Sequence, residues 1–235
     1  DDLSNAFSGT VTFSTDSGSA VTVVDTTALD LLALTAASLS VTSGGAVTDS
    51  GTLAITGATT ISASGQDITL DEAASTFGTL ALTGSNVAVT ENAAMDLGAS
   101  TIGGTANFNS TSNVITDSGT LAITGATTIN AGTADITLDQ AASTFGALAL
   151  TGANVAVTEN AATDLAASTV SGTLGITSTG AVTDSGTLAI TGATTISASG
   201  QDITLDEAAS TFGALALTGA NVAVTENAAT DLGAS

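Results

Sequence analysis

The stretch TDSGTLAITGATTI occupies residues 48–61 and recurs without a change at residues 116–129 and 183–196. The three copies start 68 and then 67 residues apart, and the sequence between them repeats as well. A chain with an internal period of this kind is an array, in which the stacking of each unit on the next sets the fold. The period therefore indicates a repeat architecture rather than an irregular globular domain.

Apolar residues alternate with small polar ones inside each period. In the segment GTLAIT, which begins at Gly51, Leu53 and Ile55 point to one side of an extended chain, and Thr52 and Ala54 point to the other. This period of two predicts a β-strand with one buried face. Glycine, asparagine, aspartate and serine stand between such strands, where turns require them. A helical repeat array is excluded, because β-branched residues dominate and the apolar period is two.

The strands group into coils. We expect three coils in each period, opening at Gly51, Gly78 and Gly104, two of them with about 25 residues and one with about 17. Stacking like strands over like predicts an all-β fold, a right-handed parallel β-helix or β-solenoid of about ten coils in a 67–68-residue super-repeat. In this arrangement one parallel sheet holds the leucines that open the coils and point into the core: Leu53, Leu80, Leu121, Leu148 and Leu188.

The whole chain, 1–235, is expected to be a single solenoid. Residues 1–49 read as a diverged partial repeat, 50–117 as repeat 1, 118–184 as repeat 2 and 185–235 as a partial repeat 3. The N-terminal part still carries the pattern, because AFSGTVTF near its start matches TFGTLALT of repeat 1. Every part is therefore expected to add coils to one continuous core.

The composition limits the possible partners. The chain has 22 acidic side chains and no lysine, arginine or histidine, which gives a formal net charge of −22. Phosphate groups are neutralised by lysine and arginine, so neither nucleic acid nor an anionic membrane surface is an expected partner. No apolar run approaches the roughly 18 residues of a membrane helix, which predicts no membrane insertion. The chain has no cysteine, so disulfides and thiol chemistry are excluded.

The sequence of repeat 1 and its neighbours, GTLAITGATTISASGQDITLDEAASTFGTLALTGSNVAVTENAAMDLGAS, resembles the repeats of filamentous-haemagglutinin-type exoproteins. The similarity covers nearly the whole chain from Phe7 and is carried by ITGATTI, DITLD, LTG-x-NV and DLGAS. The resemblance implies a right-handed parallel β-helix, an extracellular location on the bacterial cell surface, and a role in adhesion, biofilm or surface structure. The chain departs from the family in having no lysine or arginine and no N-terminal secretion domain.

Acidic residues recur at fixed places in the repeat. Carboxylates that follow each ITL strand suit the oxygen ligands of Ca²⁺ and are the candidate metal residues: Asp71, Asp139 and Asp206. The alternative is that the acids occupy solvated turns and accept hydrogen bonds from nearby backbone N–H groups. We expect weak binding of divalent cations at several such turns, and no other cofactor.

The sequence predicts a protein that is not an enzyme. General acid–base chemistry would have to use carboxylates alone, and these repeat with the fold instead of forming one unique site. Three phenylalanines that each precede a glycine, Phe77, Phe145 and Phe212, are interpreted as core residues. Asn86 and its counterparts are interpreted as turn residues, in preference to a stacked ladder of side chains.

These observations favour a non-catalytic extracellular structural protein, either a fibre or filament subunit or a segment of a stalk. An open coil end carries unpaired backbone groups, so head-to-tail self-association into filaments is expected. The alternative is an adhesin shaft that presents a ligand-binding region to host cells or surfaces. A long non-repetitive insertion would favour the shaft, and none is present in the sequence.

Overall fold

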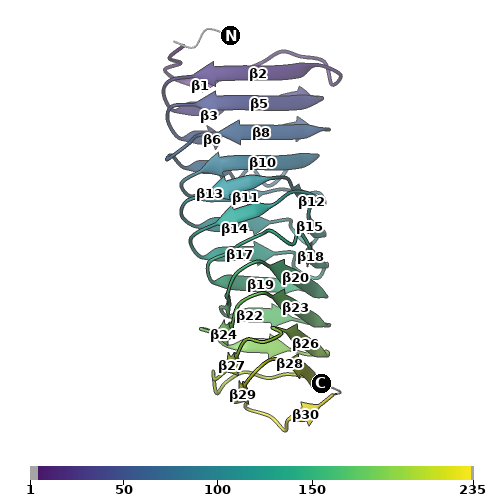
Figure 1. Cartoon of the computed structure of the whole chain (residues 1–235). Coiled ribbons are helices and arrows are strands. Elements are labelled where there is room, and N and C mark those ends of the chain that lie inside the picture. The colour runs from purple at the N-terminus through teal and green to yellow at the C-terminus, as the bar shows by residue number, and fades with distance from the viewer. Residues whose placement is uncertain (1–4, 234–235) are drawn as a thin grey trace.

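Short strands alternate along the chain between two large parallel sheets, which wind around one core (Figure 1). A computed structural model describes residues 5–233, and none of these residues is helical. The described part of the chain has no helix long and apolar enough to cross a membrane. The all-β parallel solenoid expected from the period-two pattern is confirmed.

Each large sheet has 14 strands. The main path of sheet 1 is β1 (Thr10–Val11), β3 (Leu29–Leu31), β6 (Val47–Asp49), β9 (Ile68–Leu70), β11 (Val87–Thr90), β14 (Ala106–Asn109), β17 (Thr127–Asn130), β19 (Leu148–Gly152), β21 (Thr163–Leu165), β24 (Val182–Asp184), β27 (Ile203–Leu205) and β29 (Val222–Val224). Two strands extend this sheet sideways, β22 (Ser168–Val170) and β25 (Leu188–Ile190).

The main path of sheet 2 is β2 (Ala20–Asp25), β5 (Ser38–Ser43), β8 (Ala58–Ser62), β10 (Thr79–Gly84), β12 (Met95–Leu97), β15 (Ile115–Asp117), β18 (Ile136–Leu138), β20 (Val155–Glu159), β23 (Leu174–Ser178), β26 (Thr194–Ser197), β28 (Ala214–Thr218) and β30 (Asp231–Leu232). Its side strands are β13 (Ser100–Ile102) and β16 (Leu121–Ile123). A third, two-stranded sheet pairs β4 (Leu34–Ala36) with β7 (Leu53–Ile55).

One turn of the solenoid is shorter than the expected long coil. Val47 is paired with Ile68, and Ile68 with Val87, so these turns take 21 and 19 residues. The solenoid has about 11 turns. The expected coils of about 25 and about 17 residues are therefore wrong. Each rung must lie over the rung before it around a bore of constant width, so the turns have similar lengths wherever the sequence motif begins.

Equivalent strands of successive repeats lie in opposite sheets. The segment ITL forms β9 in sheet 1, β18 in sheet 2 and β27 in sheet 1 again. From β6, three pairings lead through β9 and β11 to β14, and the next copy of β6 is β15 in the other sheet. One sequence repeat thus spans three and a half turns, and each repeat presents its surface on the side opposite to its neighbours.

The half-turn corrects one expectation about the core and leaves another intact. The five opener leucines do not share a sheet, because Leu53 lies in the small sheet, Leu80 and Leu121 in sheet 2, and Leu148 and Leu188 in sheet 1. All five nevertheless have 0% of their surface exposed. The alternating pattern therefore identifies the buried face correctly, although it does not determine which strand lies over which.

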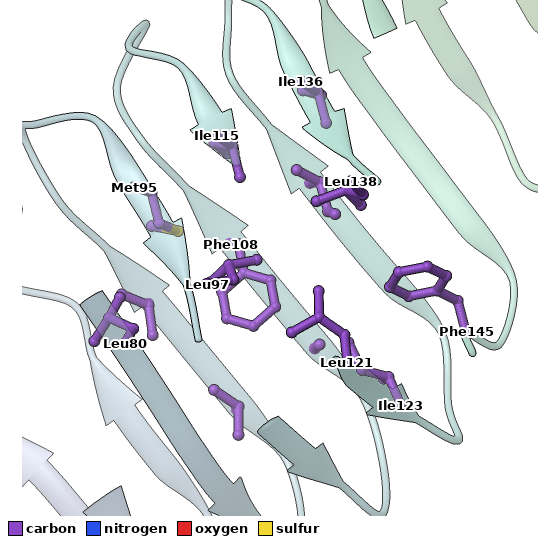
Figure 2. Packing of buried hydrophobic residues seen from close by; sticks show 14 of the residues in the cluster. Leu80, Met95, Leu97, Phe108, Ile115, Leu121, Ile123, Ile136, Leu138 and Phe145 are labelled. Carbon is purple, nitrogen blue, oxygen red and sulfur yellow. The ribbon is translucent and has the colours of Figure 1, made fainter. Parts of the chain in front are cut away.

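The core is one continuous column of aliphatic side chains with occasional phenylalanines. Figure 2 shows its middle, where Leu97, Leu121 and Leu138 gather around Phe108. Phe77, Phe145 and Phe212 are also buried, which confirms their interpretation as core residues. The buried column begins near Val21 and continues to Leu217.

Candidate functional site

The unusual side chains of this solenoid are carboxylates inside it. Glu91 and Glu159 have 0% of their surface exposed. Each follows a strand whose inward residues are two positions apart, Val87 and Val89 in the first case, so the same alternation carries the glutamate inward. The interpretation of these glutamates as solvated turn residues is therefore wrong. Inward parity was the sequence signal that identified them.

Each buried glutamate closes a loop against its own coil. The backbone N–H of Phe77 donates to Oε2 of Glu91 at 2.9 Å, and that of Phe145 donates to Oε1 of Glu159 at 2.8 Å. Thr163 Oγ1 also donates to Glu159, at 2.8 Å. Glu91 has Met95 at the corresponding place, and its Oε1 accepts no hydrogen bond from the described residues.

Burial dominates the ionisation of these glutamates. It raises the pKa of Glu91 to about 8, although the N–H group of Phe77 favours the charged form and lowers the pKa in part. Burial also raises the pKa of Glu159, and the hydrogen bonds from Phe145 and Thr163 oppose the increase. Near neutral pH the Glu91 position therefore lies within the range in which a proton is gained or lost.

A second set of buried acids ends the VTD strands. Asp49, Asp117 and Asp184 are each two residues beyond an inward valine or isoleucine, and each is buried. Burial raises the pKa of Asp49 to about 6, hydrogen bonds from the backbone of Asp71 and Glu72 lower it, and the negative charges of these two residues raise it further. The pKa values of Asp117 and Asp184 are raised for the same first reason.

The candidate calcium residues lie beside this second set. Asp71, Asp139 and Asp206 are exposed, and each donates its backbone N–H at 2.8 Å to the buried aspartate of the preceding turn. They follow β9, β18 and β27, so the middle one lies on the opposite side of the rod. Among residues 5–233, no three histidine, cysteine or acidic side chains are close enough to hold one metal ion. The three aspartates are not brought together, and calcium binding stays a prediction.

The asparagines form ladders rather than isolated turns. Asn86 donates from Nδ2 to Oδ1 of Asp67 at 2.9 Å, and its own Oδ1 accepts the N–H and the hydroxyl of Thr105, both at 3.0 Å. Asp135, Asn154 and Thr173 repeat this arrangement one period later. Three successive turns are thus joined by side chains, and the preference for a turn role alone is corrected.

A glycine makes room for each ladder. A Cβ atom on Gly104 would lie 2.4 Å from Oδ1 of Asn86, and one on Gly172 would lie 2.5 Å from Oδ1 of Asn154. No real Cβ approaches an oxygen this closely, so the glycine is required where the ladder passes. The adjacent Gly103 is not restricted in this way, since its Cβ would be 4.0 Å from the nearest atom.

The invariant loop AAST also has a structural task that the sequence did not reveal. Ser75 is fully buried, and its Oγ accepts the backbone N–H of Leu53 at 3.0 Å. Ser143 accepts that of Leu121 in the same way, and Ser210 that of Leu188. These serines satisfy a strand N–H that no backbone carbonyl reaches, which explains why the loop is repeated so faithfully.

Taken together, the polar groups bind the chain to itself. They form clamps at the buried acids and ladders at the turns, and their pattern repeats with the fold. A family described as "Repeats of unknown function (DUF5649)" matches residues 18–83, 84–151 and 152–219. No curated protein and no solved structure gives a significant match to the chain.

Proposed function

The chain belongs to the family of DUF5649 repeats, whose three matched copies fill most of its length, and we propose that it is a non-catalytic structural rod of an extracellular fibre, filament or stalk. The observation that carries this proposal is the unbroken ladder of parallel strands over about 11 turns around one core. At the usual spacing of neighbouring strands, these turns give a rod on the order of 50 Å long.

The polar groups support a structural role. The buried acids, the asparagine ladders and the serines of the AAST loops all bind backbone or neighbouring turns, and each recurs with the repeat. Catalysis requires a group that is set apart from the periodic pattern, whereas these groups serve every repeat alike. The extracellular, cell-surface location rests on the resemblance to haemagglutinin-type repeats and on the many unpaired acids, which keep rods soluble.

End-to-end stacking is the proposed mode of assembly. Val222 and Leu232 in the last described coil are 46% and 71% exposed, whereas their counterparts one double period earlier, Val87 and Leu97, are 2% and 0% exposed. Together with Leu217, Val224 and Thr230 they line a depression of about 410 Å³. A further coil, from more of the chain or from a second copy, would cover this apolar end and continue both sheets.

Electron microscopy and sedimentation of the purified chain test the assembly. We expect filaments several times longer than one rod of about 50 Å, growing with concentration. Val222→Asp should prevent growth, because it places a charge inside the joint. Ala223→Asp on the outward face of the same strand is the matched control and should assemble. Single rods at every concentration in the wild-type chain would overturn the proposal of head-to-tail stacking.

The adhesin shaft is the less favoured function. It would need a surface that departs from the repeat, and the one irregular loop within residues 5–233 gains a single residue over its counterparts. Binding of isolated rods to host cells or matrix, with no filaments formed, would support the shaft instead.

A further inference from the structure

The periodic pattern breaks at one loop. Between β14 and β15, residues 110–114 hold one residue more than the corresponding loop after β23, which accounts for the period of 68 rather than 67 at this place. Thr111 and Ser112 have φ angles of 47° and 76°, and they are the two described non-glycine residues in the left-handed region. Such backbone is costly for side chains other than glycine and persists only where the surroundings hold it.

Neighbouring turns supply that hold. The hydroxyl of Thr111 donates to the carbonyl oxygen of Glu91 at 2.9 Å, and the N–H of Asn113 donates to that of Ser110 at 3.1 Å. Ser112 fills the space that Gly132 leaves in the next turn, since a Cβ on that glycine would be 2.4 Å from the Ser112 hydroxyl oxygen. The loop is therefore an ordered projection at the side of the rod.

The loop begins with the tripeptide Asn109-Ser110-Thr111. Of the eleven asparagines in the chain, this is the one followed two positions later by serine or threonine. In exported proteins an Asn-x-Ser/Thr tripeptide is the acceptor signal for N-linked glycans, which occupy surface loops. The single acceptor signal and the single insertion thus coincide.

The geometry leaves the acceptor nitrogen free. Asn109 ends β14 and points outward, opposite in parity to the fully buried Phe108. Its Oδ1 accepts the N–H of Thr111 at 3.2 Å, whereas its Nδ2 donates to none of the described residues. Thr111 and Ser112 beside it are exposed. A sugar attached to Nδ2 would therefore leave the core and the strand pairing of β14 intact.

We propose that Asn109 is a site of N-linked glycosylation, with a sugar activated as a diphosphate as the donor. In the transfer, Nδ2 of Asn109 forms a bond to C1 of the sugar as the bond from C1 to the diphosphate oxygen breaks. The diphosphate leaves with the electron pair, and Nδ2 loses one proton to a base of the glycosyltransferase. The proposal rests on the export that the proposed function includes. Attachment is expected before the coils close, while the enzyme has access to the extended tripeptide.

The next turn contains an internal control. Asn130 lies directly over Asn109 in the sheet register, and its Oδ1 accepts the N–H of Gly132 at 2.9 Å. Position and backbone bonding are thus alike in the two asparagines. Asn130 is followed by Ala131 and Gly132, so it lacks the hydroxyl of the acceptor signal and should remain unmodified.

The test makes the full chain in cells whose secretory pathway transfers oligosaccharides from a lipid diphosphate, and separately incubates purified chain with a soluble N-glycosyltransferase and a nucleotide-diphosphate hexose. Peptide mass mapping should find Asn109 modified and Asn130 unmodified. A whole oligosaccharide would identify the lipid-linked donor, and a single hexose the nucleotide-linked one. Thr111→Ser should retain the modification, and Thr111→Ala should lose it with an unchanged circular dichroism spectrum.

Asn109 unmodified in both arms, or equally modified in Thr111→Ala, would overturn the proposal. Electron microscopy of the same samples records filaments independently. A chain that assembles without a glycan refutes the modification and leaves the structural function standing. A glycosylated chain that stays a single rod does the reverse.

Discussion

The backbone N–H of Phe77 donates to the buried carboxylate of Glu91 at 2.9 Å, so an aromatic residue at the entrance of one turn is held by an acid further along the same coil. The bond recurs between Phe145 and Glu159, on the opposite side of the rod. A structural hydrogen bond to an acid with a raised pKa makes the stability of the solenoid depend on pH.

Glu91→Gln should remove part of that dependence. The folded-state pKa of about 8 lies above the ordinary value of 4.5, so the stability linked to the protonated group is complete below 4.5 and is lost as the pH rises through 8. Gln keeps an acceptor for Phe77 and never ionises. It should raise the free energy of unfolding at about pH 9 by on the order of 2 kcal/mol and change little at about pH 4.

Urea denaturation at several pH values measures this effect. Asp231→Asn, at an exposed acid, is the control for the loss of one charge and should keep the wild-type profile. Equal pH dependence in Glu91→Gln and the wild-type chain would contradict the role of Glu91.

Leu148→Asp should unfold much of the rod. The side chain of Leu148 is fully buried in β19, where a carboxylate would have no partner. We expect a loss on the order of 4 kcal/mol in the free energy of unfolding. Thr151→Asp, on the outward face of the same strand, should cost little. Similar thermal stability of the two variants would show that the inward face has been misassigned.

Gly104→Ala should strain the asparagine ladder, because the new Cβ would meet Oδ1 of Asn86 at 2.4 Å. A loss of about 1–3 kcal/mol in unfolding free energy is expected. Gly103→Ala, one residue away, has room for its Cβ and is the matched control. Adding Asn86→Ala to Gly104→Ala should recover part of the loss, and a double-mutant cycle without any coupling would refute the close approach.

Pyrene labels report the length of a turn, since the chain has no cysteine of its own. Thr69 and Ala88 are paired in register in sheet 1, so cysteines at both positions should carry pyrenes about 5 Å apart and give excimer fluorescence. Coils of about 25 residues would instead place Thr69 against Asp96, which lies in sheet 2. Excimer from the pair Thr69 and Asp96, with none from Thr69 and Ala88, would require a different winding.

Calcium should bind weakly and at several separate places. Calorimetry of the wild-type chain is expected to give small heats, reduced when all three exposed aspartates are replaced: Asp71→Asn, Asp139→Asn and Asp206→Asn. Calcium or acid should also increase light scattering, because either reduces repulsion between chains of charge −22. No heat and no change in scattering would exclude this role.

The fold and the buried face follow from the sequence because the period-two pattern is local. Val87 and Val89 point inward whatever lies above them, and the same parity identifies Glu91 as buried. The winding does not follow. The strands of successive motifs are so alike that burial alone favours no particular partner, and the length of a turn depends on how the chain closes around the bore.

The candidate site could be predicted only in part. Asp71 is exposed at a turn as expected, but its contact with the buried Asp49 joins residues 22 positions apart. The ladder from Asp67 to Asn86 likewise depends on a turn of 19 residues. Both contacts require the true turn length, which the sequence motif of 67–68 residues conceals.

Because one repeat advances the chain by three and a half turns, the number of repeats acts as a parity switch for whatever follows them. An odd number of repeats delivers the next segment on one side of the rod, and an even number delivers it on the other. Gain or loss of a single repeat would therefore do more than change the length. It would rotate every downstream surface by half a revolution while leaving the core and the backbone ladder undisturbed.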